Sequence, residues 1–205
     1  MSEIQYMVKP DWISWDEVQE CQRKAHEATN NINGLHMTVQ DLLGDDLKKD
    51  IESGDGYCFI ALDGKKVVGV HGLKFFIGNR WWSRGKKVAY NCMDGILPEY
   101  QGTDVYYGLG DLRMKYTKES GAEIIQSNTA ECNLRIRKIA KVKKFKVVQY
   151  SATGKGADYY SVVMAKWLNG CPYSDSYINF MFNLSKIFIK ALSKPGYKFR
   201  FWPFS

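Results

Sequence analysis

The segment ILPEYQG at residues 96–102 decides how the chain folds. It closes a strand that the apolar run over residues 88–97 predicts, and a helical pattern over residues 105–119 follows it directly. Gly121 then stands where a helix C-terminus favours a left-handed residue. Residues 96–102 are therefore expected to form a tight turn from a strand into a helix.

The residues before this turn predict a strand, two helices and an antiparallel meander. Ser14 is placed to cap the first helix, and Asp63-Gly64 is the strongest short hairpin signal in the chain. A second helix, starting after Thr38, should end at the breaker 53–56. The expected elements are a strand at 4–8, a helix with Trp15, Val18, Cys21 and Ala25 on one face, a helix with Val39, Leu42, Leu43, Leu47 and Ile51 on one face, and strands at 57–62, 66–76 and 88–97.

The residues after the turn complete an α/β fold with a mixed (α+β) sheet. The expected order is β-α-α-β-β-β-α-β-α-β-β, followed by a C-terminal helical extension. We expect one domain at 1–168 and the extension at 169–205. The remaining predicted elements are a short strand led by Ile124 and Ile125 and ending at Asn128, a helix from about 133 to 143, and strands at 147–151 and 159–167.

The extension carries a strongly apolar helix over residues 177–192. Its polar positions Asn179, Asn183, Lys186 and Lys190 form one narrow stripe at helical spacing, so we expect a mostly buried helix. Packing within the molecule or in a homodimer would bury it. Weak binding to a membrane surface is the alternative, because the tail at 197–204 mixes basic and aromatic residues.

Composition indicates a folded protein inside the cell. The chain has 205 residues, of which 45% are hydrophobic and 25% charged. Its net charge of +7 favours an anionic partner such as nucleic acid, a membrane surface or a phosphate-bearing cofactor. No secretory pattern or apolar span is visible, so we expect a cytoplasmic protein. A disulfide framework and a zinc site are not expected from the odd, scattered cysteines Cys21, Cys58, Cys92, Cys132 and Cys171.

The region 94–145 resembles the GNAT superfamily, the acyl-CoA-dependent N-acyltransferases. The resemblance rests on the hydrophobic-x-Pro-Glu-Tyr-x-Gly run, on a helix that reaches Gly121 without insertion, and on Asn133 twelve residues before Phe145. By element order it extends over about residues 4 to 167. It implies an acetyltransferase that uses acetyl-CoA, or another acyl-CoA, to acylate an amine.

A turn of this kind suits a pyrophosphate, because it aims backbone N–H groups and a helix N-terminus at one point. The basic helix after Asn133 could hold the ribose phosphate of coenzyme A, although lysines on a helix are usually a solvated face. The expected cofactor-binding residues are Ile96, Leu97, Gln101, Gly102, Thr103, Asp104, Val105, Tyr106, Asn128, Asn133, Arg135 and Lys138.

Three residues are candidates for catalysis. Asp94 is the candidate base, because the attacking amine must lose a proton; the alternative is that Asp94 only begins a bulge with Gly95. The resemblance implies that the backbone N–H of Ile96 polarises the thioester carbonyl. Tyr150 is a candidate for the acid that protonates the leaving thiolate, with Tyr106 or a water as alternatives.

Four positions depart from the family pattern. Asp104 and Tyr106 stand where small residues normally let phosphate approach, and Asp104 is expected to act as a plain N-cap that competes for the same amides. Ala140 replaces the tyrosine that the family often uses as acid, and Lys144 replaces a glycine. Asp104 and Ala140 support a second reading, a catalytically degenerate GNAT-fold module with a binding or structural role.

The acceptor is expected to be a small-molecule amine or an amino sugar, attacked directly in a ternary complex. The basic, aromatic hairpin tip at 79–87 could receive such a substrate or form an oligomer contact. Cys92 is interpreted as a small core residue, and His26, His36 and His71 show no metal spacing. Nucleic-acid binding ranks last, because no reading motif accompanies the positive charge.

Overall fold

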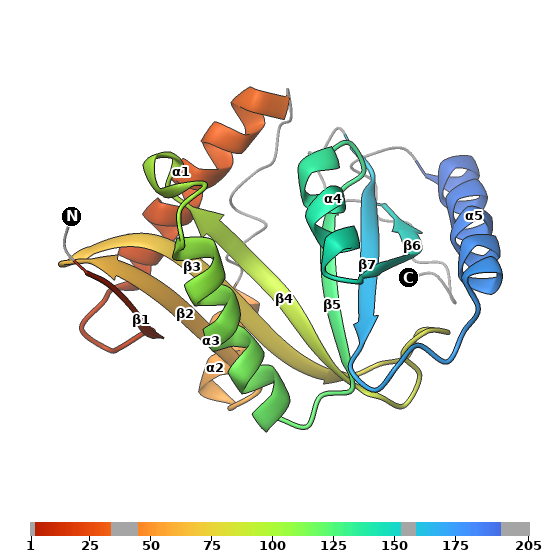
Figure 1. The fold of residues 1–205 in the computed structure, drawn as a ribbon, viewed down its shortest axis with the longest axis horizontal. Helices are drawn as coiled ribbons and strands as arrows, with labels where there is room; N and C mark the ends of the chain where they lie inside the picture. Colours follow the sequence, from red (N-terminus) through yellow and green to blue (C-terminus); the bar gives the residue numbers. More distant parts are fainter. Residues whose placement is uncertain (1–2, 34–44, 153–158, 194–205) are drawn as a thin grey trace. The chain divides into compact units, whose positions relative to one another are not determined.

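A computed structural model describes residues 3–33, 45–152 and 159–193 (Figure 1). The chain divides into two compact units, and each is considered by itself. Unit 1 comprises residues 1–75 and 90–121, and unit 2 comprises residues 76–89 and 122–205. The predicted domain boundary after residue 168 stays a prediction, and the compact units divide the chain along a different line.

The predicted element order is confirmed, including the helix of the C-terminal extension. The seven strands form one mixed sheet in the order β1-β2-β3-β4-β5-β7-β6. Predicted and observed ends mostly differ by one or two residues. The elements are β1 (Ile4–Val8), α1 (Trp15–Asn33), α2 (Asp45–Glu52), β2 (Gly56–Asp63), β3 (Lys66–Ile77), β4 (Lys87–Ile96), the 3₁₀ turn Pro98–Tyr100, α3 (Val105–Glu119), β5 (Ile124–Ala130), α4 (Leu134–Val142), β6 (Lys146–Ser151), β7 (Ser161–Trp167) and α5 (Asp175–Leu192).

The strands of unit 1 are joined as the hairpin signal predicts. β2 pairs antiparallel with β1 and with β3, and Asp63 lies opposite Lys66 at the turn. Gly64 takes the left-handed conformation that this two-residue turn needs, with φ 61°. The predicted second helix is observed from Asp45 onward, and its expected start near Thr38 lies outside the described residues.

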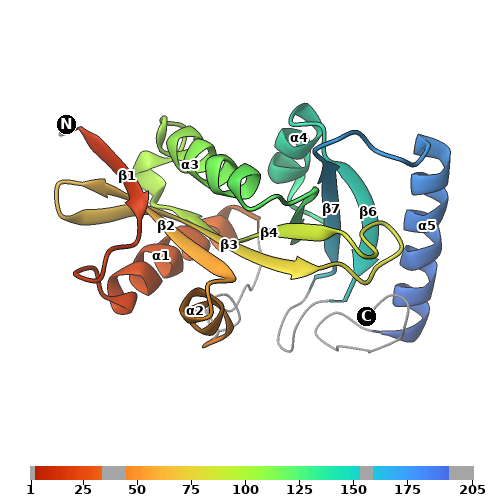
Figure 2. The same cartoon turned by 90° about the horizontal axis from the view of Figure 1, so that it is seen from below.

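The helices of unit 1 cover both faces of its strands, with α3 on one face and α1 and α2 on the other (Figure 2). α3 packs closely: a Cβ on Gly69 of β3 would lie 2.9 Å from side-chain atoms of Leu109 and Val105. α1 approaches Gly95 of β4 through Ala25, to which a Cβ there would come within 3.3 Å. The core of unit 1 therefore lies on both sides of the sheet.

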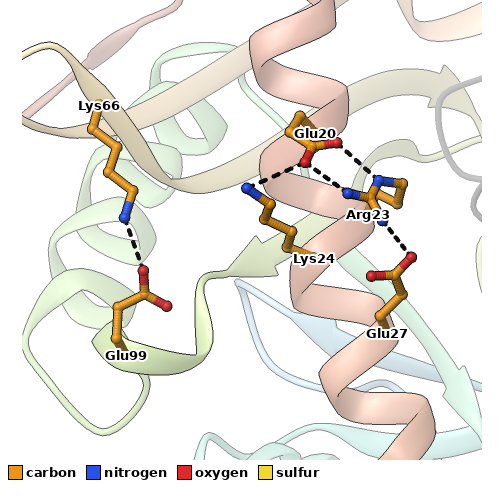
Figure 3. Close-up of polar contacts among 6 residues, drawn as sticks. All are labelled: Glu20, Arg23, Lys24, Glu27, Lys66 and Glu99. Carbon is orange, nitrogen blue, oxygen red and sulfur yellow. Dashed lines mark hydrogen bonds and ion pairs between the residues drawn. The ribbon is translucent and has the colours of Figure 1, made fainter.

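α1 begins at the residue that the sequence predicts. The Ser14 backbone N–H and Oγ both donate to the Glu17 carboxylate, and the Glu17 N–H donates to Ser14 Oγ, which is a reciprocal capping box. Figure 3 shows the exposed ion pairs further along this helix, where Glu20 is bonded by Arg23 and Lys24. These hydrogen bonds lower the pKa of Glu20 to about 2.

Unit 2 is built on an antiparallel sheet in which β7 pairs with β5 and with β6. α5 lies along β6, which has β7 on its other side (Figure 1). The Tyr150 backbone N–H of β6 donates to Ser185 Oγ of α5 at 2.9 Å. The helix thus covers a strand edge that would otherwise leave backbone groups open to further pairing.

The expectation that α5 is mostly buried is wrong. Its narrow polar stripe is present, and Ile178, Ser185 and Ile189 face the sheet, but large apolar side chains on a third side are exposed. A strand edge contacts only one side of the helix, so the large apolar side chains on the third side keep 39% to 67% of their surface exposed. In the described part of the chain, no helix is long and apolar enough to cross a membrane.

Candidate functional site

The turn after β4 is held in place by the β2–β3 hairpin. Lys66 Nζ lies 2.9 Å from the Glu99 carboxylate (Figure 3), and the Tyr100 hydroxyl donates to Asp63 at 2.6 Å. The Gln101 side-chain amide donates to the backbone oxygen of Ile96 at 3.2 Å and closes the turn from within. These contacts attach the turn, and therefore the start of α3, to two strands of unit 1.

Gly102 and Thr103 shape the start of α3. Gly102 is left-handed with φ 84°, and a Cβ there would meet no atom within 4 Å, so its backbone faces open space. Thr103 Oγ1 donates to the Tyr100 backbone oxygen at 2.6 Å and accepts the Val105 N–H at 3.4 Å. Thr103 thus caps the first amide of the helix.

Asp104 occupies the N-cap position, but its side chain makes no capping hydrogen bond. The expectation that this carboxylate caps the helix amides itself is therefore wrong, because the Thr103 hydroxyl takes the Val105 amide. Burial and the nearby charge of Asp104 raise the pKa of Tyr6 on β1. Asp104 thus opposes a phosphate through its charge and not by occupying donors.

Asp94 is paired with a buried arginine of α3. The Arg113 guanidinium donates to the Asp94 carboxylate across unit 1, and Arg113 is almost entirely buried. The Asp94 side chain keeps 41% of its surface exposed. Although removal of water around the carboxyl raises the pKa of Asp94, the charges of Arg113 and His71 outweigh this and lower it. The group is therefore ionised at neutral pH and reachable from solvent.

The strand is irregular just before this carboxylate. Met93 has φ 54°, which is uncommon for a residue with a side chain and marks a local departure from regular strand geometry. The bulge alternative for residues 94–95 is thus compatible with the base hypothesis, because a local irregularity can re-aim a neighbouring side chain. Both alternatives describe the same piece of β4.

The backbone of the next two residues is partly used by the fold. The Leu97 N–H donates to Val68 of β3 at 3.0 Å and its oxygen accepts the Tyr100 N–H at 2.9 Å. The Ile96 oxygen accepts the Gln101 side chain. Of the two residues expected to contact the cofactor, Leu97 is therefore tied into the sheet by both backbone groups.

Near β4, α1 carries the buried side chain of Gln22 and the half-buried side chain of His26, whose ring nitrogens are both buried. The side-chain polar atoms of Gln22 and His26 have no hydrogen-bond partner within the described residues. Burial lowers the pKa of His26, and the Asp94 charge opposes this change. Both residues stand one helical turn apart, so α1 presents a polar surface toward the strand that carries Asp94.

The cysteines near this strand are not activated. Burial raises the pKa values of Cys92 and Cys58 to about 12, so both remain thiols at neutral pH. This agrees with the interpretation of Cys92 as a core residue. The five cysteines are all unpaired, and no cluster of metal-ligating side chains occurs among the described residues.

Tyr150 lies within unit 2, on β6. It is 1% exposed, its ring packs against Tyr160 and Phe182, and its hydroxyl donates to the Glu131 carboxylate at 2.6 Å. Burial and this hydrogen bond raise the pKa of Tyr150. The phenol is therefore protonated, but its proton is already engaged. Its role as an acid stays a prediction.

The α4 region contains the other predicted cofactor residues. Asn133 caps α4, with its Oδ1 accepting the Ile136 N–H at 3.2 Å. Arg135 and Lys138 are exposed, and no ion pair among the described residues involves them. Asn128 lies inside β5, which continues to Ala130, and its side chain accepts from Gln126 at 3.1 Å. Of the predicted cofactor residues in this region, Arg135 and Lys138 have exposed cationic groups, and Lys141 of α4 and Lys144 are also exposed.

Two neighbours of these residues have structural roles. Arg137 donates to the Glu131 backbone oxygen at 3.1 Å, which fixes it at the start of α4. Lys144 takes the left-handed conformation that ends α4, with φ 63°. The turn geometry associated with a glycine at this position is thus kept by a residue for which it is unfavourable.

The hairpin tip at 79–87 is used mainly for packing. Trp82 is buried in the core of unit 2, and Trp81 packs edge-on against Tyr173 and Tyr177. A hollow of about 230 Å³ lies beside it, lined in part by Arg84 and Trp167. The aromatic rings are therefore less available for stacking on a substrate than the sequence suggests.

Sequence reasoning missed Arg113 and Glu131. Arg113 lies within an unremarkable helical pattern 19 residues from Asp94, and Glu131 lies 19 residues from Tyr150. Arg113 falls on the same helical stripe as Val105 and Leu109, and a charged residue on an apolar stripe is a signal that could have identified it.

Comparison with known proteins places the fold. No family model and no curated protein matches the chain. An acetyltransferase from Streptococcus agalactiae has 20% identity and a TM-score of 0.59, covering 80% of this chain and 98% of that one. The PaiA N-acetyltransferase of Thermoplasma acidophilum, in complex with coenzyme A, has 17% identity and a TM-score of 0.58, covering 80% and 99%.

A third structure covers more of the chain. FeeM, an N-acyl amino acid synthase from uncultured soil microbes, has 10% identity and a TM-score of 0.59, covering 91% of this chain and 99% of that one. Similar structures include proteins described as members of the GNAT family. With the observed element order and sheet topology, these findings show that the chain has the fold of the GNAT superfamily.

Proposed function

We propose that this protein is an N-acyltransferase that moves an acetyl group from acetyl-CoA to the primary amine of a small molecule or amino sugar. The observation that carries the proposal is the ionised, accessible Asp94 carboxylate on β4, next to a turn of the GNAT type. The similar structures support the fold and the reaction class. The acceptor is inferred from the chemistry of the proposed base.

A primary amine is largely protonated at neutral pH, because an alkylamine has a pKa of about 10. It must lose a proton before its nitrogen can attack the thioester carbon. Asp94 accepts that proton, directly or through water. As the C–N bond forms, the C–S bond breaks, the new amide nitrogen releases its remaining extra proton to water, and the coenzyme A thiolate takes a proton from Tyr150 or from water.

The turn and α4 provide the groups that would hold an acyl-CoA. At the turn, Gly102 leaves its backbone open, and Asp104 does not occupy the helix amides with its side chain. The charge of Asp104 weakens the attraction of the turn for a diphosphate, and Arg135 and Lys138 on α4 of unit 2 present exposed positive charge that suits a ribose phosphate. When bound, acyl-CoA supplies the activated acetyl thioester.

Thiol release from acetyl-CoA in the presence of amino sugars, polyamines and amino acids tests the proposal. Asp94→Asn should lower kcat by roughly 10²–10⁴-fold, the usual contribution of a positioned base. The same variant should keep the rise in Tm that acetyl-CoA produces, because Asp94 does not hold the cofactor. Asp111→Asn removes an exposed carboxylate of α3 and is the matched control.

The alternative is a degenerate GNAT-fold module without catalysis. The hydrogen-bonded state of Tyr150 and the charge of Asp104 favour it. If millimolar acetyl-CoA causes no change in Tm and no amine releases thiol, the module reading replaces the enzyme reading. If cofactor binding is observed and Asp94→Asn is fully active, the base is a different group.

We further propose a cytoplasmic location. Cys132 and Cys171 are exposed and unpaired, and Cys21 and Cys58 are buried and unpaired. Exposed free thiols are typical of a reducing compartment. Alkylation of both exposed cysteines in intact cells by a membrane-permeable reagent, but not by an impermeable one, would support this location.

A further inference from the structure

α5 presents a broad apolar face to solvent. Its large apolar side chains on this face are between 39% and 67% exposed. A soluble protein rarely exposes such a contiguous row of aromatic and aliphatic side chains to this degree without an interaction to explain it. The residues are Tyr177, Phe180, Ile187, Phe188 and Leu192.

The geometry of the helix separates three surfaces. Ile178, Ser185 and Ile189 face β6 and are buried. With 100° between successive residues, the exposed apolar residues occupy a sector of roughly 140° beside that buried side. The remaining sector holds the polar stripe, with Asn179, Asn183, Lys186 and Lys190. α5 thus has two apolar sides, one packed on β6 and one exposed to solvent, and a third side that is polar.

Charge is distributed unequally between the two units. Unit 2 contains 18 Lys and Arg but only 4 Asp and Glu, a formal charge of +14. Unit 1 contains 11 Lys and Arg and 18 Asp and Glu, a formal charge of −7. Such an asymmetry within one chain is typical of proteins that bind nucleic acid or a membrane through their basic part. The exposed apolar face belongs to the basic unit.

We propose that α5 binds the surface of an anionic membrane, with its apolar face in the boundary between headgroups and acyl chains. Basic charge with an exposed apolar helix is the combination that interfacial binding needs. Lys190 of the polar stripe is exposed, with its ammonium 5.7 Å from the ring centroids of Tyr150 and Tyr160, and a flexible lysine side chain of this kind can turn toward lipid phosphates. The proposal does not depend on the catalytic activity.

Two other occupants explain the observations less well. A second copy would bring two units of charge +14 together across the same face, and their repulsion opposes such a contact. A nucleic acid would use the positive charge but has no use for Phe180 and Ile187, because phosphate contacts dominate its binding. An anionic membrane uses both features.

Flotation of the full chain with lipid vesicles tests the proposal. Vesicles of phosphatidylcholine with phosphatidylglycerol should carry the protein to the top of the gradient, and vesicles of phosphatidylcholine alone should carry much less. Phe180→Ser with Ile187→Ser should lower the partition coefficient at least tenfold, which corresponds to about 1.4 kcal/mol. Both side chains are more than half exposed, so the variant keeps its core.

Val142→Ser is the matched control, because this residue of α4 is 82% exposed and also apolar. Equal loss of binding for the control and the double variant would overturn the assignment to α5. Absence of flotation with anionic vesicles would overturn the proposal. The proposal would also be overturned if light scattering showed that the unaltered protein is a dimer and the double variant a monomer. If the double variant binds both RNA and anionic vesicles as well as the unaltered protein does, the interaction is generally electrostatic and the proposal is overturned.

Discussion

Replacing Ser185 by alanine tests how α5 closes the edge of the sheet. Ser185 is fully buried, accepts the Tyr150 N–H at 2.9 Å and donates to the Phe182 backbone oxygen at 2.7 Å. Without the hydroxyl, the amide on the edge of β6 stays under the helix without a partner. An orphaned buried amide costs about 1–3 kcal/mol.

A helix interior prefers alanine to serine by a few tenths of a kcal/mol, which offsets part of this cost. We therefore expect Ser185→Ala to lower the free energy of unfolding of unit 2 by about 1–2 kcal/mol. The effect should be local. Exchange of the Tyr150 amide with solvent deuterium should accelerate by a factor of about 5–30, because that factor corresponds to this free energy.

Hydrogen exchange measured by mass spectrometry or NMR provides the test, with chemical denaturation as a second measurement. Ser176→Ala, on the exposed first turn of α5, is the control and should change neither quantity. If Ser185→Ala leaves Tyr150 exchange at the rate of the unaltered protein, the hydrogen bond does not hold the helix to the strand. The edge of β6 would then not be closed by Ser185.

Three further perturbations follow from backbone geometry and charge. Gly72→Ala should destabilise unit 1 by about 1–3 kcal/mol in chemical denaturation, because its Cβ would lie 2.9 Å from the Cys92 backbone oxygen. Lys144→Gly should raise Tm by roughly 1–4 °C, because it removes a left-handed strain worth about 1 kcal/mol. Because the pKa of Asp94 is lower in the folded than in the unfolded protein, its ionised carboxylate stabilises the fold at pH values above the unfolded pKa of about 4, and this stabilisation is lost as pH falls through the folded pKa. Asp94→Asn should therefore flatten the acid side of a plot of unfolding free energy against pH. An unchanged acid side would show that pairing with Arg113 does not stabilise the fold.

Local signals in the sequence predicted the fold well. Ser14 capped its helix and Gly64 formed the hairpin turn, because capping and turn chemistry involve residues only two or three positions apart. The helix Val105–Glu119 was predicted to the residue, since its apolar period is uninterrupted. Such features need no knowledge of the rest of the chain.

The candidate site was less predictable, because its contacts join distant residues. Asp94 could be identified by its position at the end of a strand, but its pairing with Arg113 depends on how α3 packs on β4. Asp104 was expected to cap α3, but the hydroxyl of the preceding Thr103 accepts the Val105 N–H instead, and the Asp104 side chain makes no capping hydrogen bond. The opposite charges of the two units could not be predicted from the composition of the chain, because the units are defined by contacts between residues.

The charge of unit 2 creates two interactions that can be separated. Phosphate binding by Arg135 and Lys138 and membrane binding by α5 both weaken as salt screens their charges. Only the second also depends on apolar side chains, so Phe180→Ser with Ile187→Ser should leave the acetyl-CoA-induced rise in Tm unchanged at every salt concentration. Arg135→Gln with Lys138→Gln should lower that rise and reduce vesicle binding only slightly, because 16 basic residues of unit 2 remain. Loss of both properties in either variant would mean that one surface serves both ligands, and the division of roles between α4 and α5 would be wrong.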